Sequence, residues 1–260
     1  MAGGGEGEFM HGLARRLFPI CRSLTGNGVR ETFSILQECL PTLELTEVSS
    51  GTAAFDWTVP DEWNIRSAYV LGPDGKKVID FSGNNLHVVG YSVPVNKIIP
   101  LAELQSHLHS IPELPDAIPY VTSYYHRTWG FCLAHQQRES LVDGDYRVVI
   151  DSTLAPGSLT YGELIIPGAT NKEVLISTYV CHPSMANNEL SGPVVATQLA
   201  MWLLQQKNLR YTYRFVFVPE TIGSIVYISR NLDVLKANVQ AGFNVSCVGD
   251  DRAYSYLHVS

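Results

Sequence analysis

The spacing of apolar residues predicts two helices and a strand at the start of the chain. Apolar positions recur every three or four residues over 9–20 and again over 29–40, which is typical of amphipathic helices. A turn at residues 23–28 separates the two stretches, and Pro41 ends the second. Apolar and polar residues then alternate over 43–48, which indicates a short strand. These elements are too few to bury one another, so we expect them to pack on a later part of the chain.

A different pattern fills residues 55–157, where glycine and proline separate short apolar runs. The runs at 68–71 and 77–81 flank Pro73-Asp74-Gly75, and this arrangement predicts a β-hairpin. The regular turns and the β-rich composition favour a small, mainly antiparallel domain. Its other expected elements are strands around 91–95, 130–134 and 146–150 and a short helix over 101–108.

From residue 158 onward the pattern indicates an α/β fold. The stretches 174–180 and 213–218 are almost continuously apolar, as expected for strands buried on both faces. The full series is a strand at 174–180, a helix at 193–206, a strand at 213–218, a helix at 225–236 and a strand at 241–248. Right-handed crossovers would make these three strands parallel.

The composition excludes several classes of partner. Twenty-five acidic residues against 18 basic ones give a net charge of −7, which argues against nucleic acid as a partner. No apolar run approaches the roughly 20 residues of a membrane span, and residues 1–8 have no feature of a signal peptide. The five cysteines form no CxxC pair, which fits reduced thiols. We therefore expect a cytoplasmic protein of one or two domains, with neither a nucleic-acid nor a membrane partner.

Polar side chains follow each of the three predicted strands. His182 and Glu189 come after the first, Glu220 after the second, and Asp250 and Asp251 after the third. The carboxyl ends of parallel strands meet at one edge of a sheet, where ligands of α/β proteins bind. Zinc takes nitrogen and oxygen ligands of this kind, and a spare glutamate could deprotonate its bound water. One such residue alone is more often a helix cap, but three successive strand ends favour a metal site.

Several segments resemble a known enzyme family. Residues 174–260 resemble the M28-type zinc aminopeptidases, and the segments 124–132, 181–184 and 249–256 are similar to a largely uncharacterised bacterial aminopeptidase-like group. The resemblance implies a phosphorylase/hydrolase-like α/β core, with helices on both faces of a mixed, mainly parallel sheet, interrupted by a β-rich insert. It implies three parts: 1–54 and 158–260 for the core, and 55–157 for the insert.

The resemblance also assigns roles to individual residues. His182 corresponds to the first zinc ligand, although Ser184 replaces the aspartate that orients it. Asn188 stands where the family has its bridging aspartate, and Glu189 follows it. Glu220 corresponds to the general base in one alignment and to a zinc ligand in an alignment shifted by one residue.

The departures from the family motifs favour one zinc ion over two, and leave open a chain without a metal. An amide at position 188 carries no charge to offset two dications. Ser246 replaces a further aspartate ligand, and the family's last histidine ligand would lie beyond Ser260. The resemblance thus implies that this chain is the N-terminal part of a longer design. We expect one exposed sheet edge, through which a second copy could bind.

Three further residues are candidates for binding the substrate. Arg127 lies among aromatic residues and could hold a substrate carboxylate, or it could stack on Trp129 in a packed hairpin. Asp250 and Asp251 could accept a substrate amine, or they could belong to an ordinary turn. Together with these residues, the resemblance implies a zinc-dependent, aminopeptidase-like hydrolase of a peptide or aminoacyl substrate. The alternative is a non-catalytic binding protein that keeps the same cleft.

Overall fold

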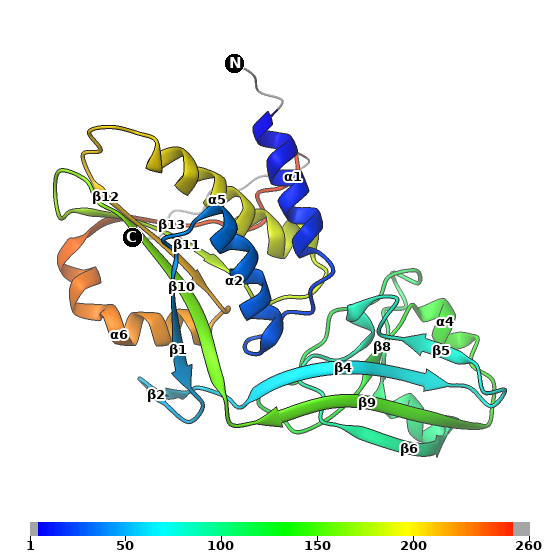
Figure 1. Cartoon of the computed structure of the whole chain (residues 1–260). Coiled ribbons are helices and arrows are strands. Elements are labelled where there is room, and N and C mark those ends of the chain that lie inside the picture. The colour runs from blue at the N-terminus through cyan, green and yellow to red at the C-terminus, as the bar shows by residue number, and fades with distance from the viewer. Residues whose placement is uncertain (1–4, 252–260) are drawn as a thin grey trace. The chain divides into compact units, whose positions relative to one another are not determined.

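The computed structural model describes residues 5–251, which fold into two compact units (Figure 1). The first unit comprises the described residues of Met1–Val59 and Ser158–Ser260, and the second is Pro60–Gly157. We describe each unit by itself. Among the described helices, none has the length and apolar character needed to cross a membrane.

A five-stranded sheet forms the centre of the first unit. Its strands, in spatial order, are β1 (Glu44–Ser49), β10 (Ser158–Ile166), β12 (Thr212–Val218), β11 (Glu173–Tyr179) and β13 (Val239–Asn244). The pairs β11–β12 and β11–β13 are parallel, as their apolar patterns predicted. The pairs β1–β10 and β10–β12 are antiparallel, so the expectation of a mainly parallel sheet was wrong.

Strand β10 accounts for this difference, because its sequence does not have the pattern of a buried strand. Gly162 lies in its middle, and a Cβ there would come within 2.9 Å of Phe33 Cε1. The missing side chain thus lets the second helix pack closely on the sheet, but it also breaks the apolar pattern.

The third strand of the α/β series, β13, ends at Asn244 rather than at the expected residue 248.

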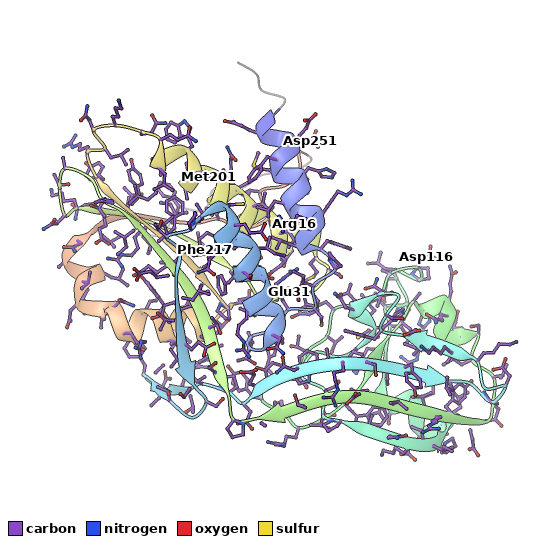
Figure 2. The ribbon with its side chains drawn as sticks, viewed as in Figure 1. Arg16, Glu31, Asp116, Met201, Phe217 and Asp251 are labelled. Atoms are coloured by element: carbon purple, nitrogen blue, oxygen red, sulfur yellow. The ribbon has the colours of Figure 1, made fainter. Side chains whose placement is uncertain are left out.

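Helices cover both faces of this sheet. On one face lie α1 (Gly5–Leu17), α2 (Asn27–Cys39) and α5 (Ser191–Leu204), and on the other lies α6 (Ile222–Asn238) (Figure 1). The apolar stripe of α2 places Val29, Phe33 and Leu36 in one buried cluster with the sheet residues Phe215 and Phe217. Figure 2 labels Phe217 within this unit. Each of the clustered side chains contributes about 1.5–3 kcal/mol through burial. The packed helices therefore fix the sheet whose strand ends carry the candidate chemistry. Two short strands, β2 (Ala53–Ala54) and β3 (Trp57–Thr58), pair beside the sheet.

The second unit is built on an antiparallel sheet of four strands. Their spatial order is β5 (Lys77–Asp80), β4 (Glu62–Leu71), β9 (Asp145–Ala155) and β6 (Val95–Pro100). The predicted hairpin is confirmed, with Val70 opposite Ile79. The strand expected over 91–95 begins only at Val95, because Tyr91 has a positive φ of 68° and leaves the extended conformation.

Short elements complete the second unit. The expected helix over 101–108 consists of α3 (Leu101–Leu104) and the 3₁₀ turn η2 (Gln105–His107). The strand expected over 130–134 is reduced to β8 (Phe131–Cys132), which pairs with β7 (Leu108–His109). The remaining elements are the 3₁₀ turn η1 (Asn85–His87) and the helix α4 (His135–Glu139).

Candidate metal centre

Three parallel strands of the first unit end at the same edge of its sheet. Strand β11 lies between β12 and β13 and is parallel to both, so the loops that follow them emerge side by side. Each loop contains one non-glycine residue with a positive φ: Ser184 at 44°, Thr221 at 58° and Cys247 at 54°. This conformation is costly, above all for a β-branched threonine, and it is concentrated at functional sites. The backbone therefore marks this edge independently of the side chains.

The imidazole of His182 faces an oxygen atom from each of its two nitrogens. His182 Nε2 lies 3.0 Å from Glu220 Oε2, and His182 Nδ1 lies 3.0 Å from Asn188 Oδ1. Asn188 turns its Nδ2 toward Cys247 Sγ at 3.8 Å, which leaves Oδ1 for the imidazole. A neutral imidazole has only one N–H to donate. A second cationic partner, either a proton or a metal ion, is therefore needed between the ring and one of these oxygens.

The cysteine before His182 lies within reach of the same point. The potential ligand atoms of Cys181, His182 and Glu220 all lie within 4.8 Å of one another. Cys181 Sγ also accepts the main-chain N–H of Glu220 at 3.2 Å. Burial raises the pKa of the Cys181 thiol well above its usual value, so the thiol stays neutral in the absence of a cation.

Cys181 was not among the metal ligands expected from the sequence, and in a strand it would point to the face opposite His182. Strand β11 ends at Tyr179, so Cys181 and His182 already belong to the loop, where this alternation no longer holds. The signal that could have indicated Cys181 is its position directly beside the histidine after a buried strand.

Asn188 and Glu189, which the sequence analysis proposed as metal ligands, lie beside the other nitrogen of His182. Glu189 Oε2 is 3.5 Å from His182 Nδ1, and Glu189 Oε1 accepts the main-chain N–H of Cys181 at 2.5 Å. Both residues thus face Nδ1, whereas Glu220 faces Nε2. In this arrangement Asn188 and Glu189 lie on the side of the imidazole ring opposite Glu220.

A π-helical turn over Ala186–Leu190 places these two side chains. Such turns contain one more residue than an α-helical turn and often occur at functional sites. The turn rotates the side chains of Asn188 and Glu189 relative to those of a regular helix. Matching motifs position by position therefore could not show which way the two residues point.

Glu189 is a fully buried acid. Burial raises its pKa from the ordinary value of 4.5 to about 8, while the nearby Arg22 guanidinium acts in the opposite direction. The carboxyl group therefore titrates near neutral pH when no metal is bound.

This pKa predicts how the stability of the metal-free chain depends on pH. In the folded chain the pKa of Glu189 is raised from 4.5 to about 8, so the folded state favours the protonated carboxyl group. The contribution of this protonated group to the free energy of unfolding is fully present below pH 4.5 and is lost as the pH rises toward about 8. In the presence of a chelator, the stability of the wild type should therefore fall relative to that of Glu189→Gln between about pH 5 and pH 8. The slope should be at most about 1.4 kcal/mol per pH unit. Urea unfolding at several pH values measures it, and parallel profiles for the two proteins would contradict the raised pKa.

Asp250 lies at the exit of β13, next to the π-helical turn. Its Oδ2 accepts a hydrogen bond from Asn187 Nδ2 at 2.8 Å, and Asn187 Oδ1 accepts the N–H of Gly249 at 2.7 Å. Asn187 thus connects the loop after β13 to the turn that follows His182. Asp251 is exposed and is the last described residue, so the rest of the similar segment, 252–256, lies outside the described residues.

Arg127, the other candidate for substrate binding, belongs to the second unit. Its Nη2 donates to Asp61 Oδ2 at 3.0 Å beside a cavity of about 190 Å³ that Tyr91, Tyr124 and Tyr125 help to line. Trp129, the alternative partner of Arg127, stacks on His107 with ring centroids 3.6 Å apart. Arg127 is thus held by an ion pair at the rim of an aromatic cavity.

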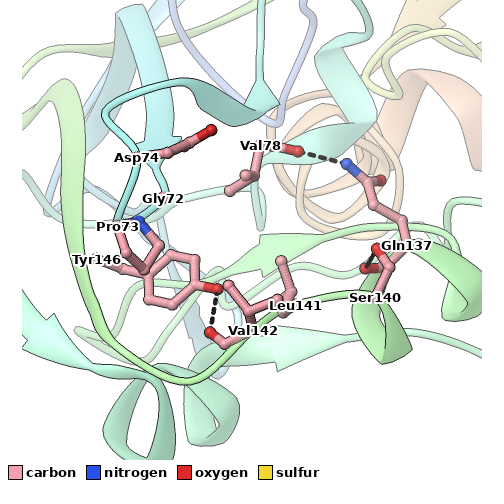
Figure 3. A pocket seen from close by; sticks show the side chains of 9 residues that line it. All are labelled: Gly72, Pro73, Asp74, Val78, Gln137, Ser140, Leu141, Val142 and Tyr146. Atoms are coloured by element: carbon pink, nitrogen blue, oxygen red, sulfur yellow. Dashed lines mark hydrogen bonds between the residues drawn. The ribbon is translucent and has the colours of Figure 1, made fainter.

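A cavity of about 440 Å³ also lies in the second unit, next to the β4–β5 hairpin (Figure 3). Gln137 Nε2 donates to the main-chain oxygen of Val78, and Tyr146 Oη donates to that of Val142 at 2.7 Å. Asp74 pairs with Lys76 at 3.2 Å. These polar side chains already have partners in the protein, so we place the candidate chemistry at the strand ends of the first unit.

Comparison with known proteins agrees with the architecture. A family model described as "Domain of unknown function (DUF4910)" matches residues 11–260. A Clostridium acetobutylicum protein named "Putative polysaccharide biosynthesis protein with aminopeptidase-like domain" is 54% identical over 97% of this chain. The chain spans 57% of the length of that protein. A crystal structure titled "putative peptidase", from the same species, superimposes with a TM-score of 0.91 at 54% identity, covering 95% of this chain and 57% of that one.

More distant structures share the fold. A zinc aminopeptidase from Bacillus subtilis has a TM-score of 0.60 at 11% identity, covering 93% of this chain and 69% of its own. A peptidase M28 precursor from Shewanella amazonensis has a TM-score of 0.59 at 11% identity, covering 90% and 70%. At this identity the likeness concerns the fold alone. Because the family model matches residues 11–260, the chain belongs to the DUF4910 family, and its fold is similar to that of the zinc aminopeptidases.

Proposed function

We propose that this chain carries the metal centre of an aminopeptidase-like hydrolase, which cleaves a peptide or amide bond next to a free amine. The observation that carries the proposal is the pair His182 Nε2 and Glu220 Oε2, 3.0 Å apart at the meeting point of two parallel strand ends. When the proton of a neutral His182 is assigned to Nδ1, facing Asn188 Oδ1, Nε2 presents a lone pair to a carboxylate. A cation shared by the two atoms resolves that conflict.

The available donors suit zinc. Imidazole nitrogen, carboxylate oxygen and thiolate sulfur are its usual ligands, and His182, Glu220 and Cys181 supply one of each. Zinc–nitrogen and zinc–oxygen bonds of about 2.0–2.2 Å at a tetrahedral angle put two ligand atoms roughly 3.3–3.6 Å apart, so the observed separation of 3.0 Å must widen by a few tenths of an ångström when zinc binds. Asn188 and Glu189 face the other ring nitrogen, so we propose one ion.

The residues divide the work as follows. Zinc, when bound, lowers the pKa of water to about 7 and polarises a carbonyl group. His182, Glu220 and Cys181 would hold the ion, while Asn188 Oδ1 would accept the proton of His182 Nδ1, so that Nε2 remains available to the metal. Asp250 presents a carboxylate at the adjacent strand end, where it can accept the ammonium group of an aminoacyl substrate.

The comparisons support this proposal. The fold is similar to that of the zinc aminopeptidase from Bacillus subtilis. The name of the Clostridium acetobutylicum relative includes an aminopeptidase-like domain. Metal dependence, substrate and activity are the part that we propose for this chain.

Metal analysis of the purified chain tests the proposal. After reconstitution with zinc and removal of excess metal, the wild type should retain about one equivalent, and His182→Ala should retain less than about a tenth of that. His11→Ala, which changes an exposed histidine on α1, serves as the matched control and should bind zinc like the wild type. If the wild type itself retains less than about a tenth of an equivalent of zinc, cobalt or manganese, the chain is the non-catalytic binding protein instead.

A further inference from the structure

A buried arginine from the start of the chain reaches the candidate metal centre. Arg22 lies in the loop between α1 and α2, and only 1% of its surface is exposed. Its Nη1 donates to the main-chain oxygen of Leu17 at 2.7 Å and to Thr32 Oγ1 at 3.3 Å, which fixes the guanidinium to both helices. Its Nε donates to the main-chain oxygen of His182 at 3.0 Å. One side chain thus ties the first two helices to the loop after β11.

The same guanidinium faces the acid beside the imidazole. Arg22 Nε lies 3.6 Å from Glu189 Oε1, and both side chains are fully buried. Glu189 in turn holds the main-chain N–H of Cys181 and lies beside Nδ1 of His182. Two hydrogen bonds therefore hold the Cys181–His182 segment. Arg22 donates to the main-chain oxygen of His182, and Glu189 accepts the main-chain N–H of Cys181.

The loop that carries Arg22 is tightly constrained. A Cβ at Gly28 would lie 2.1 Å from the main-chain oxygen of Cys21, so no other residue fits there without a shift of the backbone. Ser23, Leu24 and Thr25 are all buried. A loop closed in this way gives Arg22 a fixed origin and leaves its guanidinium little freedom to move away from His182.

The buried pair is incompletely satisfied, although it lies in a packed interior. Within the described part of the chain, Arg22 Nη2 is a buried atom without a hydrogen-bond partner. An unsatisfied buried polar atom costs about 1–3 kcal/mol, and a well-packed apolar pair would avoid that cost. The pair therefore does not give the greatest stability possible at these two positions, and its hydrogen bonds to the Cys181–His182 segment point to a role in holding that segment.

We propose that Arg22 is a positioning residue of the metal centre. Together with Glu189 it holds the segment Cys181–His182 so that the imidazole presents Nε2 to Glu220 before any ion binds. Arg22 touches neither the ion nor the substrate and acts only through His182 and Glu189. This inference rests on the proposed function, since it assigns a support to the same site.

Cobalt titration of the metal-free chain tests the role, because the visible spectrum of Co²⁺ reports the coordination geometry as well as the affinity. Arg22→Met should bind Co²⁺ about 10–100-fold more weakly than the wild type and give an altered spectrum. Arg22→Lys keeps the charge but lacks the planar fork, so its affinity should lie between the two. If Arg22→Met does not fold, the double variant Arg22→Met/Glu189→Met replaces the whole buried pair by apolar side chains and should give the same weakened binding.

Arg214→Lys is the matched control for a general loss of stability. Arg214 is also a buried arginine of the first unit. It lies on β12 and pairs with Glu173 at the start of β11, away from the carboxyl ends of these strands. The Arg214→Lys variant should lower the melting temperature and leave the Co²⁺ affinity and spectrum unchanged. The positioning role is overturned if Arg22→Met or the double variant binds Co²⁺ like the wild type, or if Arg214→Lys weakens binding equally. If the wild type binds no Co²⁺, the proposed function fails and this role fails with it, whereas normal binding by the Arg22 variants leaves the proposed function standing.

Discussion

Glu220→Gln should lower kcat/KM for the hydrolysis of an aminoacyl amide by about 10²–10⁴. Glutamine has nearly the same shape as glutamate but carries no negative charge, so it neither attracts a cation nor accepts a proton from water. The loss should be large because the Glu220 carboxylate lies 3.0 Å from Nε2 of His182, the nitrogen proposed to bind the metal. Initial rates on aminoacyl-amide substrates, measured with the zinc-loaded protein, give the comparison.

The control for this experiment is Glu38→Gln. Glu38 is an exposed glutamate on α2 that pairs with Arg16 at 2.9 Å, so the variant should keep the activity of the wild type. The zinc content of Glu220→Gln then shows which of its two family roles this residue has. Because we propose that Glu220 is a ligand, the variant should lose zinc together with activity. An inactive variant that retains a full equivalent of zinc would make Glu220 the general base, and an active variant would remove it from the site.

The largest effect on stability should come from Arg214→Met, which should lower the free energy of unfolding by about 3–5 kcal/mol. Arg214 is buried on β12, where it makes hydrogen bonds to Glu173 at 2.6 and 2.9 Å and to Glu163 at 2.6 Å. The Glu173 carboxylate holds the pKa of Arg214 above its ordinary value. Methionine fills the space but leaves two acids of the sheet without their counter-charge.

Chemical denaturation measures the loss of unfolding free energy in Arg214→Met. The control is Arg66→Met, which removes an arginine from an ion pair at the surface. Arg66 makes a bidentate pair with Asp151 in the second unit, but its side chain is 71% exposed. Exposed pairs contribute roughly 0–1 kcal/mol, so this variant should be nearly neutral. Equal losses for the two variants would contradict the view that burial makes the Arg214 cluster important.

The parts of the fold with a strong local pattern could be predicted from the sequence. The apolar stripe of α2, the hairpin turn at Pro73-Asp74-Gly75 and the doubly buried strands β11 and β12 all follow from residue spacing. Strand β10 could not be predicted, because Gly162 interrupts its apolar pattern. The glycine leaves room for Phe33, which lies far away in the sequence. The parallel or antiparallel direction of a strand pair depends on such distant contacts, and this is why a mainly parallel rather than an evenly mixed sheet was expected.

The candidate site shows the same division. Topology predicted that His182 and Glu220 would lie at neighbouring strand ends, and the structure places them in contact. The directions of Asn188 and Glu189 depend on a π-helical turn, for which the sequence carries no recognisable signal. The participation of Arg22 depends on tertiary packing between segments 160 residues apart, so no spacing rule could have indicated it.

The most direct test of the central claim is a crystal structure of the zinc-soaked protein with anomalous diffraction data collected at the zinc absorption edge. We expect one strong anomalous peak, with His182 Nε2 and a carboxylate oxygen of Glu220 both within about 2.0–2.2 Å of it. A structure at saturating zinc that has no peak at this position, and in which His182 and Glu220 remain directly hydrogen-bonded, would contradict the proposed metal centre.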